Sequence, residues 1–242
     1  MIYLKKYALV KKILFVLALS LWPICVTAQG RISVTAHAGS CSTPPNSIES
    51  LQKALSLDVD CIEIDVRRDA AGTLVISHNA VKPGEDAVLL KDALSVIRPG
   101  RSMINLDIKD SSVFPMLYRL LKRMRMLDRV FMTGVAPEDI LKARLQMPGV
   151  PYYPSFEPSV ELVSNPEYVR AMVSFLKATG SEGINCNYKS VTPELASVLK
   201  ANGLKLSVWT VDSEREMLRI ISVCPDNITS RHPDRVRELV GE

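Results

Sequence analysis

Apolar and polar positions along this chain alternate between two kinds of spacing. Short, nearly continuous apolar runs, typical of buried strands, occur at 32–36, 61–66, 103–108, 129–133, 151–156, 183–187, 204–210 and 227–230. Positions spaced for amphipathic helices lie between them, at about 46–57, 87–97, 112–127, 136–147, 165–179, 192–202, 213–223 and 233–240. The pattern predicts eight strand–helix units.

Residues at the expected helix boundaries agree with this pattern. Asn46 and Ser47 precede the first helical segment, and Thr192 precedes the sixth; such side chains cap helix N-termini. Gly180 and Gly203 follow two helical segments, where a left-handed residue commonly ends a helix. We therefore expect discrete helices joined to the strands by short loops.

Eight units with almost wholly apolar strands indicate a parallel sheet that is covered on its faces. The sheet can be an open doubly wound one or a closed barrel. No glycine-rich dinucleotide motif follows the first strand, and eight units in about 200 residues suit a lean barrel. We predict a single-domain (β/α)₈ TIM barrel over residues 29–242.

The N-terminus predicts export. Residues 1–12 carry four lysines and no acid, an apolar run follows, and small residues end it at Val26-Thr27-Ala28. This is the pattern of a cleaved signal peptide, residues 1–28, with an uncleaved membrane anchor as the alternative. We expect a periplasmic or secreted protein with no stable membrane anchor after cleavage.

The net charge bears on which partners the protein binds, and the cysteine content bears on disulfide formation. Without residues 1–28, the 214 remaining residues hold 26 basic and 26 acidic residues, so the formal net charge is zero. A neutral surface gives no reason to expect nucleic acid as a partner. Four cysteines remain and allow three pairings, but Cys61 and Cys186 lie in strand-like runs and are expected to be buried thiols.

Carboxylates lie at the ends of predicted strands, where barrels carry their chemistry. Glu63 and Asp65 occupy positions i and i+2, so both project from one face of the second strand. Asp107 lies near the end of the next strand. Buried carboxylates need a compensating cation, and oxygen ligands favour Ca²⁺ or Mg²⁺. Salt bridges to the basic residues that follow these strands are the alternative.

Two of the three histidines flank these carboxylates. His37 ends the first strand, and His78 ends a short extended stretch after the second. Histidines beside a carboxylate cluster suit general acid–base catalysis near neutral pH. Phe156, Asn187 and Tyr188 follow later strands and either line the same pocket or pack in the core.

Several segments together resemble one known family. They are His37-Ala38-Gly39, Pro44-Pro45-Asn46-Ser47, Asp60-Cys61-Ile62-Glu63-Ile64-Asp65-Val66, Gly72 to Asn79, Asp107-Ile108-Lys109, Leu206 to Val211 and Ile228 to Pro233. These resemble the motifs H-R-G, P-E-N-[ST], G-A-x-x-I-E-x-D-V, D-G-x-x-V-x-H-D, E-x-K, V-x-x-W-T-V and I-x-T-D-x-P of glycerophosphodiester phosphodiesterases. Order and spacing match over essentially the whole chain after the signal peptide.

The resemblance implies a barrel of the phospholipase-C-like phosphodiesterase type that hydrolyses glycerophosphodiesters to glycerol 3-phosphate and an alcohol. It implies one Ca²⁺ or Mg²⁺ on Glu63, Asp65 and Asp107, and His37 and His78 as general acid and base. It also implies that Lys109 holds the phosphate and that Trp209 lines the alcohol pocket. The expected partner is a small phosphodiester.

Departures from the family pattern bear on activity. Ala38 replaces an arginine that contacts the phosphate, Pro45 replaces a glutamate, and Asn79 replaces an aspartate. Asp107 is one methylene shorter than the usual glutamate, as it is in sphingomyelinases D. Arg231 is expected in the loop after the eighth strand, where barrels often bind phosphate, and is a candidate to replace the missing arginine.

Two alternatives follow from these departures. The chain is either a catalytically impaired barrel that binds phosphodiesters or phospho-sugars, or a phospholipid-cleaving relative of the sphingomyelinase D type.

Overall fold

The computed structural model describes residues 30–241, so the predicted signal peptide lies outside the described residues. From Ile32 onward the described chain forms one compact unit. Nowhere in residues 30–241 is a helix both long and apolar enough to span a bilayer.

The unit is a barrel of parallel strands. The strands are β1 (Ser33–Ala36), β2 (Cys61–Arg68), β5 (Met103–Ile108), β6 (Val130–Val135), β7 (Tyr152–Pro154), β8 (Gly183–Asn187), β9 (Lys205–Trp209) and β10 (Asn227–Ser230). Their order is β7-β6-β5-β2-β1-β10-β9-β8. A parallel bridge between Ser155 and Asn185 joins the two ends of this order. The predicted barrel is therefore confirmed.

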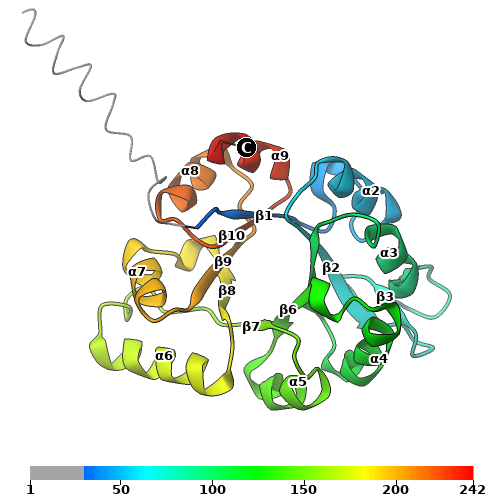
Figure 1. The fold of residues 1–242 in the computed structure, drawn as a ribbon, viewed down its shortest axis with the longest axis horizontal. Coiled ribbons are helices and arrows are strands. Elements are labelled where there is room, and N and C mark those ends of the chain that lie inside the picture. Colours follow the sequence, from blue (N-terminus) through cyan, green and yellow to red (C-terminus); the bar gives the residue numbers. More distant parts are fainter. Residues whose placement is uncertain (1–29, 242) are drawn as a thin grey trace, which may run out of the picture. The chain divides into compact units, whose positions relative to one another are not determined.

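Helices surround the strands, as Figure 1 shows. They are α2 (Ile48–Ser56), α3 (Leu90–Ile97), α4 (Phe114–Met124), α5 (Ile140–Gln146), α6 (Pro166–Thr179), α7 (Pro193–Ala201), α8 (Glu214–Ser222) and α9 (Pro233–Val240). Each lies within the segment predicted for it. Outward-facing strand residues pack on the helices in two large clusters of buried aliphatic side chains, one for each half of the barrel.

The capping predictions are largely confirmed. The Ser47 side chain accepts a hydrogen bond from the Ser50 backbone N–H at 3.0 Å, and Thr192 caps α7 in the same way. Gly180 and Gly203 adopt left-handed φ values of 71° and 67°. Asn46 also has a positive φ, 53°, but its side chain turns into the barrel instead of capping α2.

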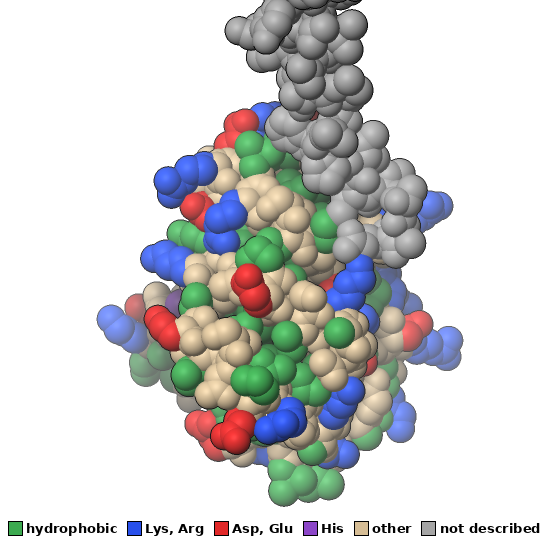
Figure 2. All heavy atoms as spheres, turned by 90° about the vertical axis from the view of Figure 1, so that its left-hand side faces the viewer, with side chains coloured by type: hydrophobic (Ala, Val, Ile, Leu, Met, Phe, Trp, Pro, Cys, Tyr) green, Lys and Arg blue, Asp and Glu red, His purple; other side chains and the backbone are tan. Residues whose placement is uncertain are grey.

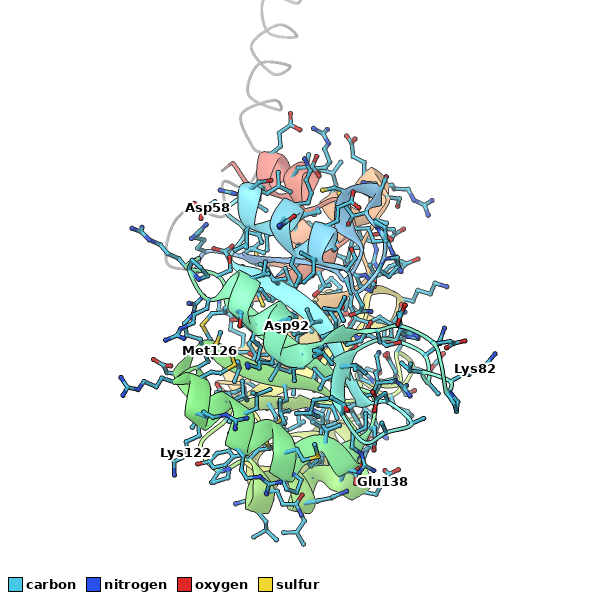
Figure 3. All side chains as sticks on the ribbon, turned by 90° about the vertical axis from the view of Figure 1, so that its right-hand side faces the viewer. Asp58, Lys82, Asp92, Lys122, Met126 and Glu138 are labelled. Atoms are coloured by element: carbon cyan, nitrogen blue, oxygen red, sulfur yellow. The ribbon has the colours of Figure 1, made fainter. Side chains whose placement is uncertain are left out.

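Two short strands lie between β2 and α3, of which the first was expected from the sequence as a short extended stretch and the second was not. The chain leaves β2 and returns as β3 (Leu74–Ile76), which pairs antiparallel with β2, and a two-residue strand β4 (Val88–Leu89) pairs with β3. Two residues are too few for a recognisable alternation, so β4 could not be predicted. In Figure 3, Lys82 projects from the loop between β3 and β4.

The interior of the barrel is polar in places. The Thr35 hydroxyl donates to the Asn227 amide oxygen at 2.7 Å, and the Asn227 amide nitrogen donates to the Ser207 hydroxyl at 3.0 Å. Cys61 and Cys186 are free, buried thiols, as predicted. On the outer face drawn in Figure 2, basic and acidic side chains are interspersed, in keeping with the neutral mixed surface predicted for the chain without its leader.

Candidate active site

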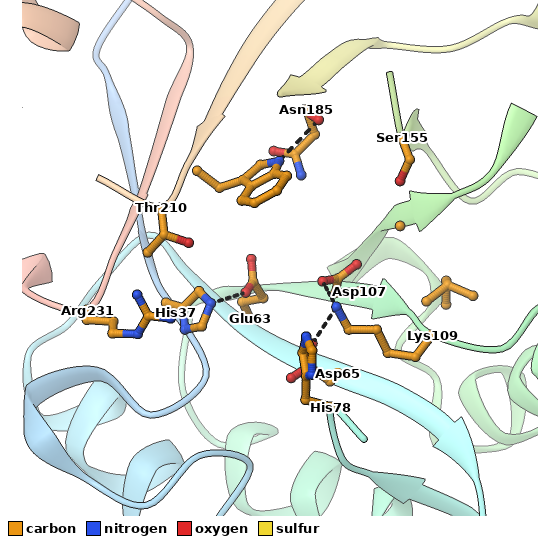
Figure 4. Close-up of a pocket in the computed structure, with 13 residues that line it drawn as sticks. His37, Glu63, Asp65, His78, Asp107, Lys109, Ser155, Asn185, Thr210 and Arg231 are labelled. Atoms are coloured by element: carbon orange, nitrogen blue, oxygen red, sulfur yellow. Dashed lines mark hydrogen bonds and ion pairs between the residues drawn. The ribbon is translucent and has the colours of Figure 1, made fainter. Parts of the chain in front are cut away.

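A cavity of about 510 Å³ lies at the carboxyl ends of the strands. Its lining includes all eight residues selected from the sequence, namely His37, Glu63, Asp65, His78, Asp107, Lys109, Trp209 and Arg231. Ile108, Gly134, Ser155, Asn185 and Thr210 complete it. Figure 4 shows these side chains converging from both halves of the barrel.

Neighbouring strands bring the three carboxylates together. Glu63 and Asp65 share the inner face of β2, only 5% and 4% exposed, and Asp107 is the register partner of Asp65 on β5. Burial raises the pKa of Glu63 well above its ordinary value, and the charges of Asp107 and Asp65 raise it further. Burial likewise raises the pKa of Asp107. The cluster holds more negative charge than the site tolerates without a cation.

Lys109 supplies part of that compensation. Its ammonium lies 2.7 Å from Asp107 Oδ2 and 3.1 Å from Asp65 Oδ1. Burial opposes the charge on Lys109, but Asp107 and Asp65 outweigh burial and raise the pKa of the lysine. Lys109 is therefore a positive charge held among the carboxylates.

Asn46 fixes the direction of Asp65. The Asn46 amide nitrogen donates to Asp65 Oδ2 at 2.7 Å, and the Asp65 backbone N–H donates to the Asn46 amide oxygen at 3.0 Å. Both groups are buried, so these two bonds leave the carboxylate little freedom. The position of Asn46 before a helical segment predicts a helix cap and does not predict this contact.

A second amide orients Glu63. The Asn105 amide nitrogen donates to Glu63 Oε2 at 3.0 Å, and the Thr133 hydroxyl donates to the Asn105 amide oxygen at 2.9 Å. The network runs across β2, β5 and β6. The register places Glu63 beside Asn105 on β5 and Asn105 beside Phe131 on β6, and Thr133 lies two residues after Phe131 on the same strand. It leaves Oε1 of Glu63 directed toward His37.

His37 has the tautomer of a base. Its Nδ1 lies 2.8 Å from the Ala38 carbonyl oxygen, which can only accept, so Nδ1 carries the proton. The other nitrogen, Nε2, lies 3.6 Å from Glu63 Oε1. Burial lowers the pKa of His37, and the positive charge of Arg231 lowers it further. A neutral imidazole with an available Nε2 suits proton abstraction.

His78 is exposed, and Figure 4 draws it on the far side of Glu63 from His37. Its Nδ1 is 3.2 Å from the Asn79 amide oxygen. Asn79 therefore supplies an orienting contact of the kind that an aspartate would supply, but without the negative charge. The Arg67 guanidinium donates to the His78 backbone carbonyl at 2.8 Å and holds the loop.

Trp209 at the end of β9 and Arg231 after β10 both line the cavity. Arg231 forms an ion pair with Asp212, with 2.6 Å between Nη1 and Oδ2. The Trp209 indole N–H donates to the Asn185 backbone carbonyl at 3.2 Å, which fixes the direction of the ring. Both residues thus lie where the sequence placed them.

Gly134 allows the Asp107 side chain to lie close to the backbone of β6. Gly134 has φ 71°, and a Cβ on it would come within 2.3 Å of Asp107 Oδ1 and 2.5 Å of the Ile108 carbonyl. The register between β6 and β7 shifts at this point. Only glycine fits here, but Gly134 was not predicted as a site residue because a single glycine inside a strand is a weak signal.

Three further candidates do not line the cavity. Phe156 and Tyr188 pack against the aliphatic cluster of the second barrel half. The Asn187 side chain accepts from the Lys189 backbone N–H and starts a short helical turn. Ser155 and Asn185, one or two positions earlier in the chain, occupy the cavity wall instead. Strand ends could not be placed from sequence to within one residue.

Whether the carboxylates fit a metal ion depends on Lys109. As the side chains lie, no group of three or more His, Cys, Asp or Glu residues among those described is arranged to hold a metal ion. The ammonium occupies the position between Asp65 and Asp107. Three carboxylates lining one cavity are nevertheless the oxygen donors that Ca²⁺ and Mg²⁺ prefer, so the donor set fits such an ion chemically.

Comparison with known proteins identifies related sequences and folds. No family model matches the chain. A glycerophosphodiester phosphodiesterase from Caldanaerobacter subterraneus subsp. tengcongensis is 27% identical over 244 residues, covering 86% of this chain and 97% of the relative. The match therefore extends over nearly the whole length of that enzyme.

Solved structures share the barrel. A glycerophosphodiester phosphodiesterase from Parabacteroides distasonis superposes with a TM-score of 0.75 at 19% identity, covering 88% of this chain and 98% of that one. A phosphodiesterase from Oleispira antarctica, in complex with the product sn-glycerol-3-phosphate, gives 0.73 at 18% identity, covering 87% and 97%. The chain is thus similar over most of its length to a glycerophosphodiester phosphodiesterase and has the barrel fold of these solved structures.

Proposed function

We propose that this protein is an exported, metal-dependent phosphodiesterase that hydrolyses glycerophosphodiesters to glycerol 3-phosphate and an alcohol. The observation that carries the proposal is the cavity, in which two histidines, three carboxylates and Lys109 converge at the carboxyl ends of the strands. The relative from Caldanaerobacter, named a glycerophosphodiester phosphodiesterase, supports it. The signal-peptide pattern of residues 1–28 supports export to the periplasm or the medium.

His37 and His78 divide the proton transfers. Neutral His37, through Nε2, removes the proton from a glycerol hydroxyl next to the phosphate, and that oxygen attacks phosphorus. His78 protonates the alcohol oxygen as its bond to phosphorus breaks. Water then opens the cyclic phosphodiester with the two roles reversed: His78 removes a proton from water, and His37 returns its proton to the glycerol oxygen. Atoms and protons balance over the two steps.

Two cations would balance the anionic centre, a bound divalent ion and the Lys109 ammonium. Glu63, Asp65 and Asp107 would hold a Ca²⁺ or Mg²⁺ ion, which supplies positive charge to the phosphate oxygens when bound. Lys109 contacts the phosphate from the same side once its ammonium leaves the space between Asp65 and Asp107. Neutralisation of developing charge is usually the largest contribution to such reactions.

The remaining cavity wall binds the substrate. Trp209 presents an aromatic surface to the alcohol or the glycerol carbons, and Arg231 lies on the side of His37 that faces away from Lys109. The cavity of about 510 Å³ accommodates a small phosphodiester.

The test is a hydrolysis assay on residues 29–242. A panel of glycerophosphodiesters, lysophospholipids and sphingomyelin is incubated with Ca²⁺, Mg²⁺ or a chelator, and the released products are measured. We expect glycerol 3-phosphate from the glycerophosphodiesters, no release with chelator, and no release from a His37→Ala variant. Release that is insensitive to chelator would refute the metal dependence.

A binding protein without turnover is the second candidate. Ala38 and Asn79, which replace a phosphate-contacting arginine and an aspartate of the family pattern, favour it. Calorimetric binding of a glycerophosphodiester with no product release from any member of the panel would establish this alternative. Release from sphingomyelin alone would indicate the phospholipid-cleaving type.

A further inference from the structure

Two motif positions of this chain differ in charge from the family pattern. The H-R-G motif of the related family carries its cation directly after the first histidine, where this chain has Ala38. The I-x-T-D-x-P motif carries an acid where this chain has Arg231. A positive charge is absent from the loop after β1 and present in the loop after β10, which is the neighbouring strand in the barrel.

The two loops meet. Residues Ser33 to Ala36 pair in register with Asn227 to Ser230. The His37 backbone N–H donates to the Ser230 carbonyl at 3.0 Å, and the Cys41 backbone N–H donates to the Arg231 carbonyl at 2.8 Å. Ala38 is 5% exposed and is not one of the residues that line the cavity. Arg231 therefore emerges beside the position that the family arginine would occupy.

Asp212 holds Arg231 at two points. Asp212 Oδ1 accepts from the Arg231 backbone N–H at 2.9 Å, and Oδ2 accepts from Nη1 of its guanidinium at 2.6 Å. Asp212 follows β9 and reaches across to the end of β10. One carboxylate thus fixes both the loop and the side-chain direction, which a flexible arginine does not achieve alone.

The held guanidinium points along the cavity. Arg231 is one of the residues that line it, and Figure 4 shows the guanidinium beside His37. Its side chain is 49% exposed, and among the described residues the only hydrogen-bond partner of its side chain is Asp212. The remaining N–H donors are therefore available to an anion in the cavity.

We propose that Asp212 is a positioning residue that aims Arg231 at the substrate phosphate, so that the phosphate-binding arginine of this site comes from the loop after β10 instead of the loop after β1. The inference rests on the proposed function for the identity of the substrate. A purely structural pair that ties two loops together is the alternative, and it requires no effect on anion binding.

The test measures binding of sn-glycerol 3-phosphate by calorimetry, with glycerol as the uncharged probe, and needs no turnover. Arg231→Gln should weaken glycerol 3-phosphate binding at least 10-fold. Asp212→Asn, whose amide oxygen can still accept from the Arg231 backbone N–H, should weaken it about 3- to 10-fold. Neither variant should change glycerol binding. Arg235→Ala, which removes an exposed ion pair on α9 outside the cavity, is the matched control.

A rescue experiment separates positioning from folding. Ala38→Arg introduced into the Arg231→Gln protein should restore most of the lost glycerol 3-phosphate affinity, because it returns a cation to the neighbouring loop. Thermal denaturation of each variant shows that it is folded. Unchanged affinity in Arg231→Gln or in Asp212→Asn would overturn the proposal, as would a wild-type protein that does not bind glycerol 3-phosphate. A wild-type protein that binds glycerol 3-phosphate but hydrolyses no glycerophosphodiester would refute the proposed enzyme activity and leave this inference standing.

Discussion

Replacing Glu63 with glutamine should stabilise the metal-free protein while abolishing its activity. Glu63 is 5% exposed, and burial together with the charges of Asp107 and Asp65 raises its pKa. Glutamine has the same shape, and its amide oxygen can still accept from Asn105. The substitution therefore removes a repelled charge and creates no cavity.

The stabilisation expected from Glu63→Gln depends on pH. A carboxyl group whose pKa is raised on folding contributes stability below its unfolded pKa of about 4, and this contribution is lost as pH rises through the folded pKa. The advantage of Glu63→Gln should therefore be absent at pH 4 and present at pH 7. Relieved active-site strain commonly yields about 0.5–2 kcal/mol, which for a domain of this size is about 1–8 °C in Tm.

Calorimetric or fluorescence melting at both pH values, in chelator, measures the effect. Glu182→Gln is the matched control, because Glu182 pairs with Lys205 at 3.0 Å on the surface with both side chains at least 40% exposed. Such a pair contributes about 0–1 kcal/mol, so the control should lose a little stability or none.

Added Ca²⁺ or Mg²⁺ should reverse the order of the two melting temperatures at pH 7, so that wild type melts above Glu63→Gln. At 100-fold excess over its Kd, a bound ion stabilises the folded state by about 2.7 kcal/mol, and the variant should gain less because it lacks one ligand. A Glu63→Gln protein that melts below wild type in chelator at pH 7 would refute the repulsion argument. An equal gain of both proteins from the ion would remove Glu63 from the metal site.

Three further predictions test other parts of the site. His37→Ala or His78→Ala should each lower kcat by about 10²-fold or more, with a bell-shaped pH–rate profile in wild type; a variant with normal turnover removes that residue from the mechanism. Asn46→Gly keeps the left-handed φ but loses both bonds to Asp65, so divalent-ion affinity measured by calorimetry should fall about 10–100-fold, and unchanged affinity would contradict its orienting role. Gly134→Ala should cost about 1–3 kcal/mol of stability and most activity; wild-type melting and turnover would show that the strand yields to the methyl group.

The fold could be predicted from the sequence because the apolar runs, the helical spacing and the helix caps all indicate the same elements. Each predicted strand corresponds to an observed one, since strands buried on both faces read as apolar runs, and caps such as Ser47 mark where helices begin. The short strand β4 and the true end of β7 were not readable. Their bounds depend on pairing with β3 and β6, which is a tertiary property.

The cavity residues were predictable as a set because a barrel brings strand ends together and because acids and histidines at such ends are unusual. Residues that act through other residues were not predictable. Asn46 resembles a helix cap, and only the fold shows that its amide contacts Asp65. Asp212 likewise resembles the start of a helix, and its ion pair with Arg231 crosses from one strand end to the next. Asn and Asp side chains serve both as helix caps and as partners that orient other side chains, so the residue type alone does not distinguish the two roles.

The charge balance of the cavity bears on the proposed metal dependence. Glu63, Asp65 and Asp107 place three carboxylates around one ammonium, that of Lys109, while the charge of Arg231 is offset by its own aspartate partner. With the carboxylates ionised, the cavity has two surplus negative charges, and a phosphodiester brings a third. Under the proposed function, Glu63, Asp65 and Asp107 would hold a divalent cation whose charge would offset this surplus, and the Lys109 ammonium would then be available to the phosphate. On this reasoning the ion acts first on substrate binding, so chelation should weaken binding of glycerol 3-phosphate as well as stop turnover.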